Sequence, residues 1–260
     1  MKTSKIVLGL SVVALATASF AFAQEIAPPP AAAEALLPER FAPEIAHFAE
    51  VDASTPPQSC AYLFVGSSSI RFWKSLTEDM APYPIINRGF GGAHIADVDY
   101  YFDKVVTPYQ ARAIFFYAGD NDLWAGKTPE KVISDFNQFM TLKTQKLGDT
   151  VPVYFIAVKP SKQRISQITL QDQVNQAVRT LGKSRSDLRF VDIVPSMLEA
   201  GVPKDIFVGD GLHMKPEGYA LWTNVVRPMV EADAKEDRPC GAAPEPKQKP
   251  KHLWFWQKKS

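Results

Sequence analysis

One stretch decides the fold of this chain: Ala61-Tyr62-Leu63-Phe64-Val65-Gly66-Ser67-Ser68-Ser69-Ile70. Its first half is a continuous apolar run, short enough for a strand that is buried on both faces. A Pro-Pro pair precedes the run, Gly66 ends it, and a helical pattern follows over residues 70–76. The serines therefore stand at a strand-to-helix turn, where backbone N–H groups and the helix dipole favour negative charge. Helix capping, for which Ser is a preferred residue, is the ordinary explanation for them.

The same alternation of strand and helix continues along the chain. Further short apolar runs occupy residues 85–87, 113–117, 153–158 and 189–193. Helical patterns occupy residues 95–106, 129–147, 170–181 and about 217–232, and a short amphipathic helix is predicted over 40–51. Strands that alternate with helices require crossover connections, so the sequence predicts an α/β fold with a five-stranded parallel sheet.

The two ends of the chain differ in composition from its centre. Lys2 and Lys5 precede an apolar run, and Ala21-Phe22-Ala23 has the form of a cleavage site, so residues 1–23 are predicted to be a signal peptide. The mature protein is then exported, to the periplasm or the medium. Residues 24–39 are an Ala/Pro-rich linker, 40–240 the folded domain, and 241–260 a basic tail rich in Pro and aromatic residues. We expect the tail to be disordered; weak contact with a membrane surface or a polyanion is the alternative.

Charge excludes one class of partner. The chain has 29 Lys+Arg and 28 Asp+Glu, and removal of Lys2 and Lys5 leaves 27 against 28. A nearly neutral chain lacks the basic face of a nucleic-acid-binding protein. His47, His94 and His252 are scattered along the sequence, so no metal site is predicted, and no cofactor is expected.

The chain has two cysteines, Cys60 and Cys240, which flank the first predicted strand and the last predicted helix. In an oxidising compartment an even pair is a candidate disulfide, and this bridge would join the two ends of the domain. Two buried free thiols are the alternative.

Polar residues follow the predicted strands at the positions where α/β proteins form their sites. Four stretches stand out in chain order: the serines after Gly66, Asn87-Arg88-Gly89-Phe90-Gly91-Gly92-Ala93, Gly119-Asp120-Asn121-Asp122, and Asp210-Gly211-Leu212-His213. Each stretch alone is explained by capping, by a turn or by a tight polar loop. Together they place Ser, Gly, Asn and an Asp/His pair on one edge of one sheet.

These four stretches resemble the four sequence blocks of the SGNH (GDSL-type) hydrolases, over roughly residues 61–230. The resemblance implies a three-layer α/β/α sandwich with a flavodoxin-like sheet, and a serine esterase activity. It assigns a catalytic triad of Ser68, Asp210 and His213, and an oxyanion hole of Ser68, Gly92 and Asn121. The first block departs from the usual Gly-Asp-Ser-Leu, because here it is Gly66-Ser67-Ser68-Ser69. The second departs too, since Ala93 and His94 follow Gly92 where many members have Asp and Thr.

The resemblance implies acyl transfer from an ester to water. Export and the lack of a long apolar lid favour short acyl groups such as acetyl, on carbohydrates or small molecules. His94, Phe90 and Trp124 are candidate pocket residues that could stack on a sugar ring. Trp73 also lies near the proposed site, but it fits the inward-facing pattern of its helix. The alternatives are an acyltransferase with the same triad, a lysophospholipase or thioesterase acting on lipids, and a non-catalytic binding module.

Overall fold

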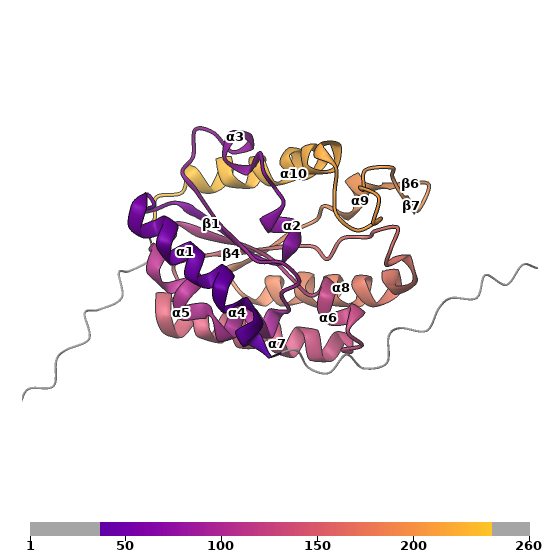
Figure 1. The fold of residues 1–260 in the computed structure, drawn as a ribbon, viewed down its shortest axis with the longest axis horizontal. Helices are drawn as coiled ribbons and strands as arrows, with labels where there is room; N and C mark the ends of the chain where they lie inside the picture. The colour runs from indigo at the N-terminus through magenta and orange to yellow at the C-terminus, as the bar shows by residue number, and fades with distance from the viewer. Residues whose placement is uncertain (1–36, 241–260) are drawn as a thin grey trace, which may run out of the picture.

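The centre of the protein is a five-stranded parallel sheet with strand order β2-β1-β3-β4-β5 (Figure 1). The structure is a computed structural model that describes residues 37–240. The strands are β1 (Tyr62–Gly66), β2 (Ile85–Gly89), β3 (Ala113–Tyr117), β4 (Val153–Ile156) and β5 (Leu188–Val191). This order is that of flavodoxin-like folds. The predicted class and architecture are therefore confirmed.

Helices cover both faces of the sheet, as the predicted sandwich requires (Figure 1). One layer contains α1 (Ala42–Ser54), α4 (Ile95–Tyr100), α5 (Phe102–Val105), α7 (Pro129–Leu147) and α8 (Ile168–Ser184). The other contains α2 (Ser68–Arg71), α3 (Leu76–Asp79), α9 (Val194–Met197) and α10 (Pro216–Ala234). Shorter pieces complete the fold: η1 (Pro38–Phe41), η2 (Thr107–Tyr109), α6 (Asp120–Trp124), η3 (Ile165–Gln167), β6 (Leu198–Glu199) and β7 (Val202–Pro203).

Alternate residues of the strands enter two separate cores. Leu63 and Val65 of β1 pack under α4 and α7, whereas Tyr62 and Phe64 pack under α10. Every residue of β1 and β3 is buried, which explains why these strands are continuous apolar runs in the sequence.

Three local predictions differ from the structure. The helix expected over residues 95–106 is two helices, which break at Tyr101, where the backbone is at φ −95° and ψ +12°. The helix expected over 70–76 is confined to α2, with α3 following as a separate turn. The polar loop expected at Gly119 is instead the start of α6, with Gly119 at φ +108°.

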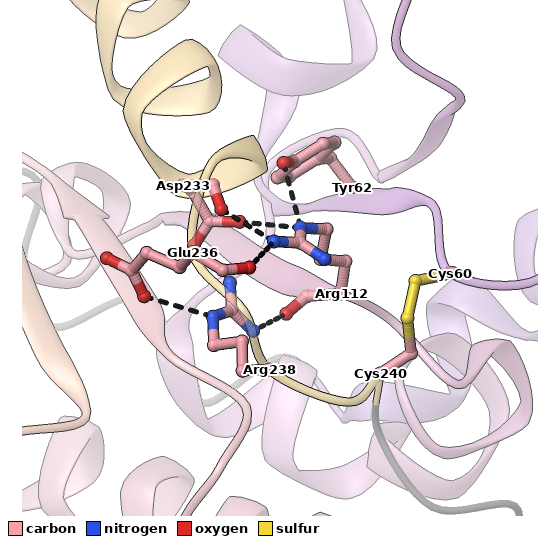
Figure 2. Close-up of a disulfide and its surroundings, with 7 residues drawn as sticks. All are labelled: Cys60, Tyr62, Arg112, Asp233, Glu236, Arg238 and Cys240. Carbon is pink, nitrogen blue, oxygen red and sulfur yellow. Dashed lines mark hydrogen bonds and ion pairs between the residues drawn. A yellow bond between two sulfur atoms is a disulfide. The ribbon is translucent and has the colours of Figure 1, made fainter.

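The predicted bridge between Cys60 and Cys240 is present, with their Cα atoms 5.3 Å apart (Figure 2). It links residues 180 positions apart in the sequence and lies at the amino end of β1. Next to it, Arg112 donates to the Tyr62 hydroxyl at 3.2 Å and to the fully buried carboxylate of Asp233 at 3.1 Å. These contacts fasten the end of α10 to the sheet.

The predicted signal peptide, the linker up to residue 36 and the tail from 241 lie outside the described residues. Pro38 and Glu39, placed in the predicted linker, belong to η1, so helical structure begins before the predicted domain start at Arg40. Between residues 37 and 240, no helix is both long enough and apolar enough to cross a membrane.

Candidate active site

Ser68 stands where β1 turns into α2. Gly66, the last residue of β1, has φ +135°, and a Cβ there would overlap the carbonyl oxygen of Tyr117 in β3. Only glycine allows this close approach. The following turn buries Ser67 and Ser69, which are 2% and 3% exposed, and leaves Ser68 partly exposed. Of the three serines, Ser68 alone faces the surface at this turn.

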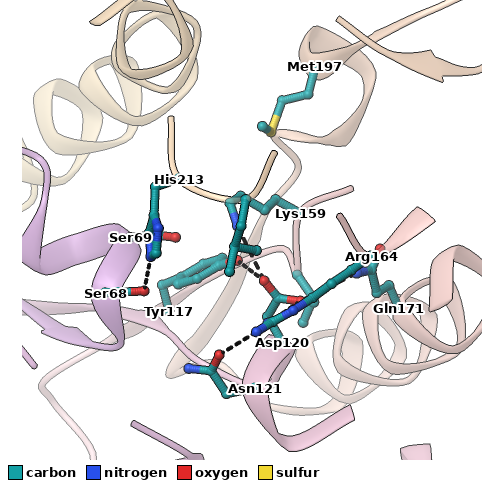
Figure 3. Close-up of polar contacts among 12 residues, drawn as sticks. Ser68, Ser69, Tyr117, Asp120, Asn121, Lys159, Arg164, Gln171, Met197 and His213 are labelled. Atoms are coloured by element: carbon teal, nitrogen blue, oxygen red, sulfur yellow. Dashed lines mark hydrogen bonds and ion pairs between the residues drawn. The ribbon is translucent and has the colours of Figure 1, made fainter. Parts of the chain in front are cut away.

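The loop before α10 brings an imidazole to that serine (Figure 3). Phe207 and Met214 form an isolated antiparallel bridge, and Gly211 turns the loop at φ +68°. The Nε2 atom of His213 lies 3.0 Å from the Ser68 Oγ atom, although the residues are 145 positions apart in the sequence.

Asp210 holds the other side of the imidazole. Its Oδ2 atom lies 2.5 Å from the His213 Nδ1 atom, and its Oδ1 atom accepts the backbone N–H groups of Leu212 at 2.8 Å and His213 at 2.9 Å. Burial alone would raise the pKa of Asp210, but these hydrogen bonds outweigh it and lower the pKa to about 2. An ionised carboxylate only accepts, so Nδ1 carries the proton and Nε2 of the neutral ring accepts from Ser68.

Phe72 touches the same imidazole and was not predicted from the sequence. Its ring packs edge to face against that of His213, with centroids 4.9 Å apart. Phe72 follows the last residue of α2, so one short helix carries both the serine and a side chain that limits the tilt of the histidine ring. An aromatic residue near a serine has no signal of its own in the sequence.

Gly92 and Asn121 lie at the ends of the two neighbouring strands. Gly92 is exposed at φ +78°, and among the contacts within residues 37–240 its N–H donates no hydrogen bond; the same holds for the N–H of Ser68. Asn121 donates from Nδ2 to the carbonyl of Ala93 at 3.1 Å, which ties α6 to the glycine loop. Figure 3 shows its amide nitrogen on the side of Ser68. Ser68, Gly92 and Asn121 thus follow three neighbouring strands of the sheet, β1, β2 and β3.

The three candidate pocket residues have different positions. Trp124 lines a cavity of about 360 Å³ together with Gln163, Arg164, Asp210 and Leu212, next to the Asp/His pair. His94 is half-buried before α4, and burial lowers its pKa, so it is neutral at pH 7. Its backbone N–H donates to Asp97 at 2.8 Å.

The assignment of Phe90 to the pocket is wrong. Its side chain is fully buried, and its ring packs edge to face against that of Phe41 at 4.9 Å, in the core under α1. The glycines that follow it place the backbone at the surface, but the side chain enters the core. Trp73 is a core residue as well, at 1% exposure, and its indole N–H donates to Asp79.

Sequence reasoning missed a buried charged cluster beside the site. Asp120, Lys159 and Arg164 are each less than 7% exposed, and Figure 3 shows them beside Asn121. A signal for Lys159 existed: it follows the fourth strand, at the edge of the sheet where sites form. Within the described range, no three His, Cys, Asp or Glu side chains are grouped to hold a metal ion.

Residues 61–221 match the family model described as GDSL-like Lipase/Acylhydrolase family. The chain belongs to this family. The matched range begins just before β1 and ends inside α10, so it includes all four sequence blocks of this GDSL-like acylhydrolase. The family consists of ester hydrolases. The resemblance to the GDSL-type hydrolases that the sequence indicated is therefore confirmed.

Solved structures show the same fold at low identity. A putative platelet activating factor from Streptococcus pneumonia has a TM-score of 0.63 and 16% identity, over 72% of this chain and 90% of that one. A putative acylhydrolase from Bacteroides fragilis has a TM-score of 0.61 and 17% identity, over 72% of this chain and 95% of that one. A catalytic mutant of an acetylxylan esterase from Geobacillus stearothermophilus has a TM-score of 0.53 and 12% identity, over 65% of this chain and 93% of that one. A comparison with curated proteins gave no match.

Proposed function

We propose that this protein is an exported serine esterase that removes short acyl groups, acetyl above all, from carbohydrate or small-molecule alcohols. One observation carries the proposal: a continuous line of contacts from Ser68 Oγ to His213 Nε2 at 3.0 Å and from His213 Nδ1 to Asp210 at 2.5 Å. This is the arrangement that makes a serine hydroxyl nucleophilic at neutral pH.

The reaction follows from that line of contacts. As Ser68 Oγ attacks the ester carbonyl, its proton passes to His213 Nε2, and the ionised carboxylate of Asp210 stabilises the imidazolium. His213 then gives the proton to the departing alcohol, which leaves an acyl group on Ser68. Water attacks this acyl-enzyme with His213 again as the base, and the carboxylic acid is released as the serine regains its proton.

The oxygen that becomes negative in both steps is stabilised by three N–H donors. These are the backbone N–H groups of Ser68 and Gly92 and the second hydrogen of the Asn121 amide, whose first hydrogen is used by Ala93. One such donor commonly accounts for about 3 kcal/mol of barrier lowering.

Two features support a short acyl group on a sugar. The cavity beside the triad has a volume of only about 360 Å³, and half-exposed Trp124 offers an aromatic face of the kind that sugars stack on. The acetylxylan esterase with a similar fold acts, by its description, on such an ester. Export is supported by the sequence of residues 1–23 and by the disulfide.

The test is a series of p-nitrophenyl esters of increasing chain length, with Ser68→Ala as the inactive control. We expect kcat/KM to be highest for acetate and to fall steadily beyond about four carbons. Highest activity on lysophospholipids or acyl thioesters would replace the proposal with a lipid hydrolase, and acyl transfer to an added sugar in preference to water would replace it with an acyltransferase.

A further inference from the structure

Three charged side chains are buried together beside Asn121. Asp120 is 3% exposed, Lys159 1% and Arg164 6%. The Asp120 carboxylate lies 3.2 Å from the Lys159 ammonium and 3.0 Å from the Arg164 guanidinium. Burial alone would raise the pKa of Asp120, but the two cations outweigh it and lower the pKa, so the carboxylate is ionised.

A buried cluster of this kind adds little to the stability of the fold, because desolvation of each ion offsets much of the attraction between them. Its presence beside the site therefore points to a role other than stability. The cluster lies beyond the carboxyl ends of β3 and β4, where Asp120 also accepts from Tyr117 at 3.5 Å and from Gln171 at 3.4 Å. Burial lowers the pKa of Lys159, while the negative charges of Asp120 and, to a smaller extent, Asp210 favour its charged form. The direct contact of the cluster with the proposed site is the one to Asn121.

Arg164 is the member of the cluster that touches the proposed oxyanion hole. One guanidinium nitrogen lies against Asp120, and the other, NH2, donates to the Asn121 Oδ1 atom at 3.0 Å. A guanidinium only donates, so the atom it meets on Asn121 must be the amide oxygen. At the other end, the Ala93 carbonyl only accepts, so it must meet the amide nitrogen, at 3.1 Å. The two contacts prevent the amide from flipping.

We infer that Arg164, held by Asp120, is a positioning residue that fixes the Asn121 amide with one N–H directed at the ester oxygen. The inference rests on the proposed function, since it explains how a half-buried, rotatable side chain becomes a preorganised donor. Preorganisation matters because a donor already aimed at the developing charge needs no rearrangement during the reaction.

A double-mutant cycle tests the inference. Arg164→Lys retains the positive charge beside Asp120, but a single ammonium cannot reproduce the planar fork that reaches both Asp120 and Asn121. We expect this variant to lower kcat on p-nitrophenyl acetate by about 10- to 100-fold, with KM changed less than about three-fold, and Asn121→Ala to lower kcat by about 100- to 1,000-fold. In the Asn121→Ala background, Arg164→Lys should change kcat by less than about two-fold.

Arg112→Lys is the matched control. Arg112 is also a largely buried arginine with a carboxylate partner, but it lies at the amino end of β3, beside Cys60 and away from Ser68 (Figure 2). The Arg112→Lys substitution should lower Tm and leave kcat within about two-fold of wild type. An equal loss of kcat from Arg164→Lys in both backgrounds, or a rise in KM alone, would overturn the inference.

A second readout does not depend on activity. The side-chain NH2 signals of Asn121, identified by their loss in Asn121→Ala, should be dispersed in a nitrogen-proton NMR spectrum of wild type and should move to the positions of a free amide in Arg164→Lys. Unchanged Asn121 signals would overturn the positioning role. If wild type hydrolyses no ester and yet these signals move as expected, the proposed function fails while the contact between Arg164 and Asn121 stands.

Discussion

At the scale of single residues, the exposure of the side chain distinguishes Ser68 from its two serine neighbours, which the sequence alone does not. Ser67 and Ser69 are buried, and Ser68 contacts His213. The resemblance placed the nucleophile at Ser68 by register alone. The proposed role stays a prediction, but the geometry now gives it a physical reason.

Ser68→Ala should lower kcat by about 10⁴-fold or more, because loss of the nucleophile leaves only the oxyanion donors and substrate binding. Labelling with a fluorophosphonate should stop, and circular dichroism should be unchanged. Ser67→Ala and Ser69→Ala are the controls: both should keep the label, which mass mapping would locate on Ser68. A label on either neighbour would show that the register is wrong.

Asp210→Asn should lower kcat by several orders of magnitude with a smaller change in KM, because an asparagine neither fixes the imidazole tautomer nor stabilises its charged form. The remaining activity should rise with pH, because hydroxide can then remove the Ser68 proton that the misoriented imidazole accepts poorly. A kcat series from pH 6 to 9 measures this. Wild-type rates in the variant would mean that Asp210 only shapes the loop.

The lowered pKa of Asp210 also predicts how its contribution to stability depends on pH. Because the folded-state pKa, about 2, lies below the value near 4 of an unfolded aspartate, the contribution is present above about pH 4 and is lost as the pH falls towards 2. The difference in Tm between wild type and Asp210→Asn should therefore not shrink between pH 7 and 5. Since Asp210 is half-exposed, we expect the difference to be small. A decline near pH 6 would contradict the assignment.

At the scale of elements, the sequence predicted what depends on local pattern. The strands β1 and β3 are apolar runs with clear ends, and both were located correctly. The break between α4 and α5 was missed because the helical pattern of residues 95–106 continues through Tyr101. Lys159 and Arg164 were missed because their partner, Asp120, comes from another strand end. The burial of Phe90 required knowing which face of the sheet α1 covers.

The turn from β1 to α2 depends on one glycine. Gly66→Ala would place a Cβ against the carbonyl of Tyr117 at a φ that side chains rarely adopt, so β1 could not keep its distance from β3. We expect a loss of about 3 kcal/mol or more in the free energy of unfolding, measured by urea denaturation. Gly182→Ala, inside α8, is the control, because the nearest atom to its Cβ would be the carbonyl oxygen of Leu188, at an ordinary 3.4 Å. It should be neutral or stabilising by up to about 1 kcal/mol.

At the scale of the whole molecule, the bridge between Cys60 and Cys240 closes the folded region. Because its ends are 180 residues apart, it removes much freedom from the unfolded chain, and its loss in the double serine variant should cost about 2–5 kcal/mol. For a domain of this size that is a fall in Tm of roughly 4–20 °C in calorimetry. The kcat should stay within two-fold of wild type, since the bridge and Ser68 lie at opposite ends of β1. A large loss of kcat without a change in Tm would contradict this.

The bridge ties the end of the described chain to the side of the sheet away from the proposed active site. Cys240 is held beside the amino end of β1, whereas Ser68 follows the carboxyl end, roughly 20 Å away along the strand. Cys240, the last residue that the structure describes, is therefore fixed at the end of the sheet opposite Ser68. A substrate of the proposed esterase would approach the sheet from the end opposite the disulfide.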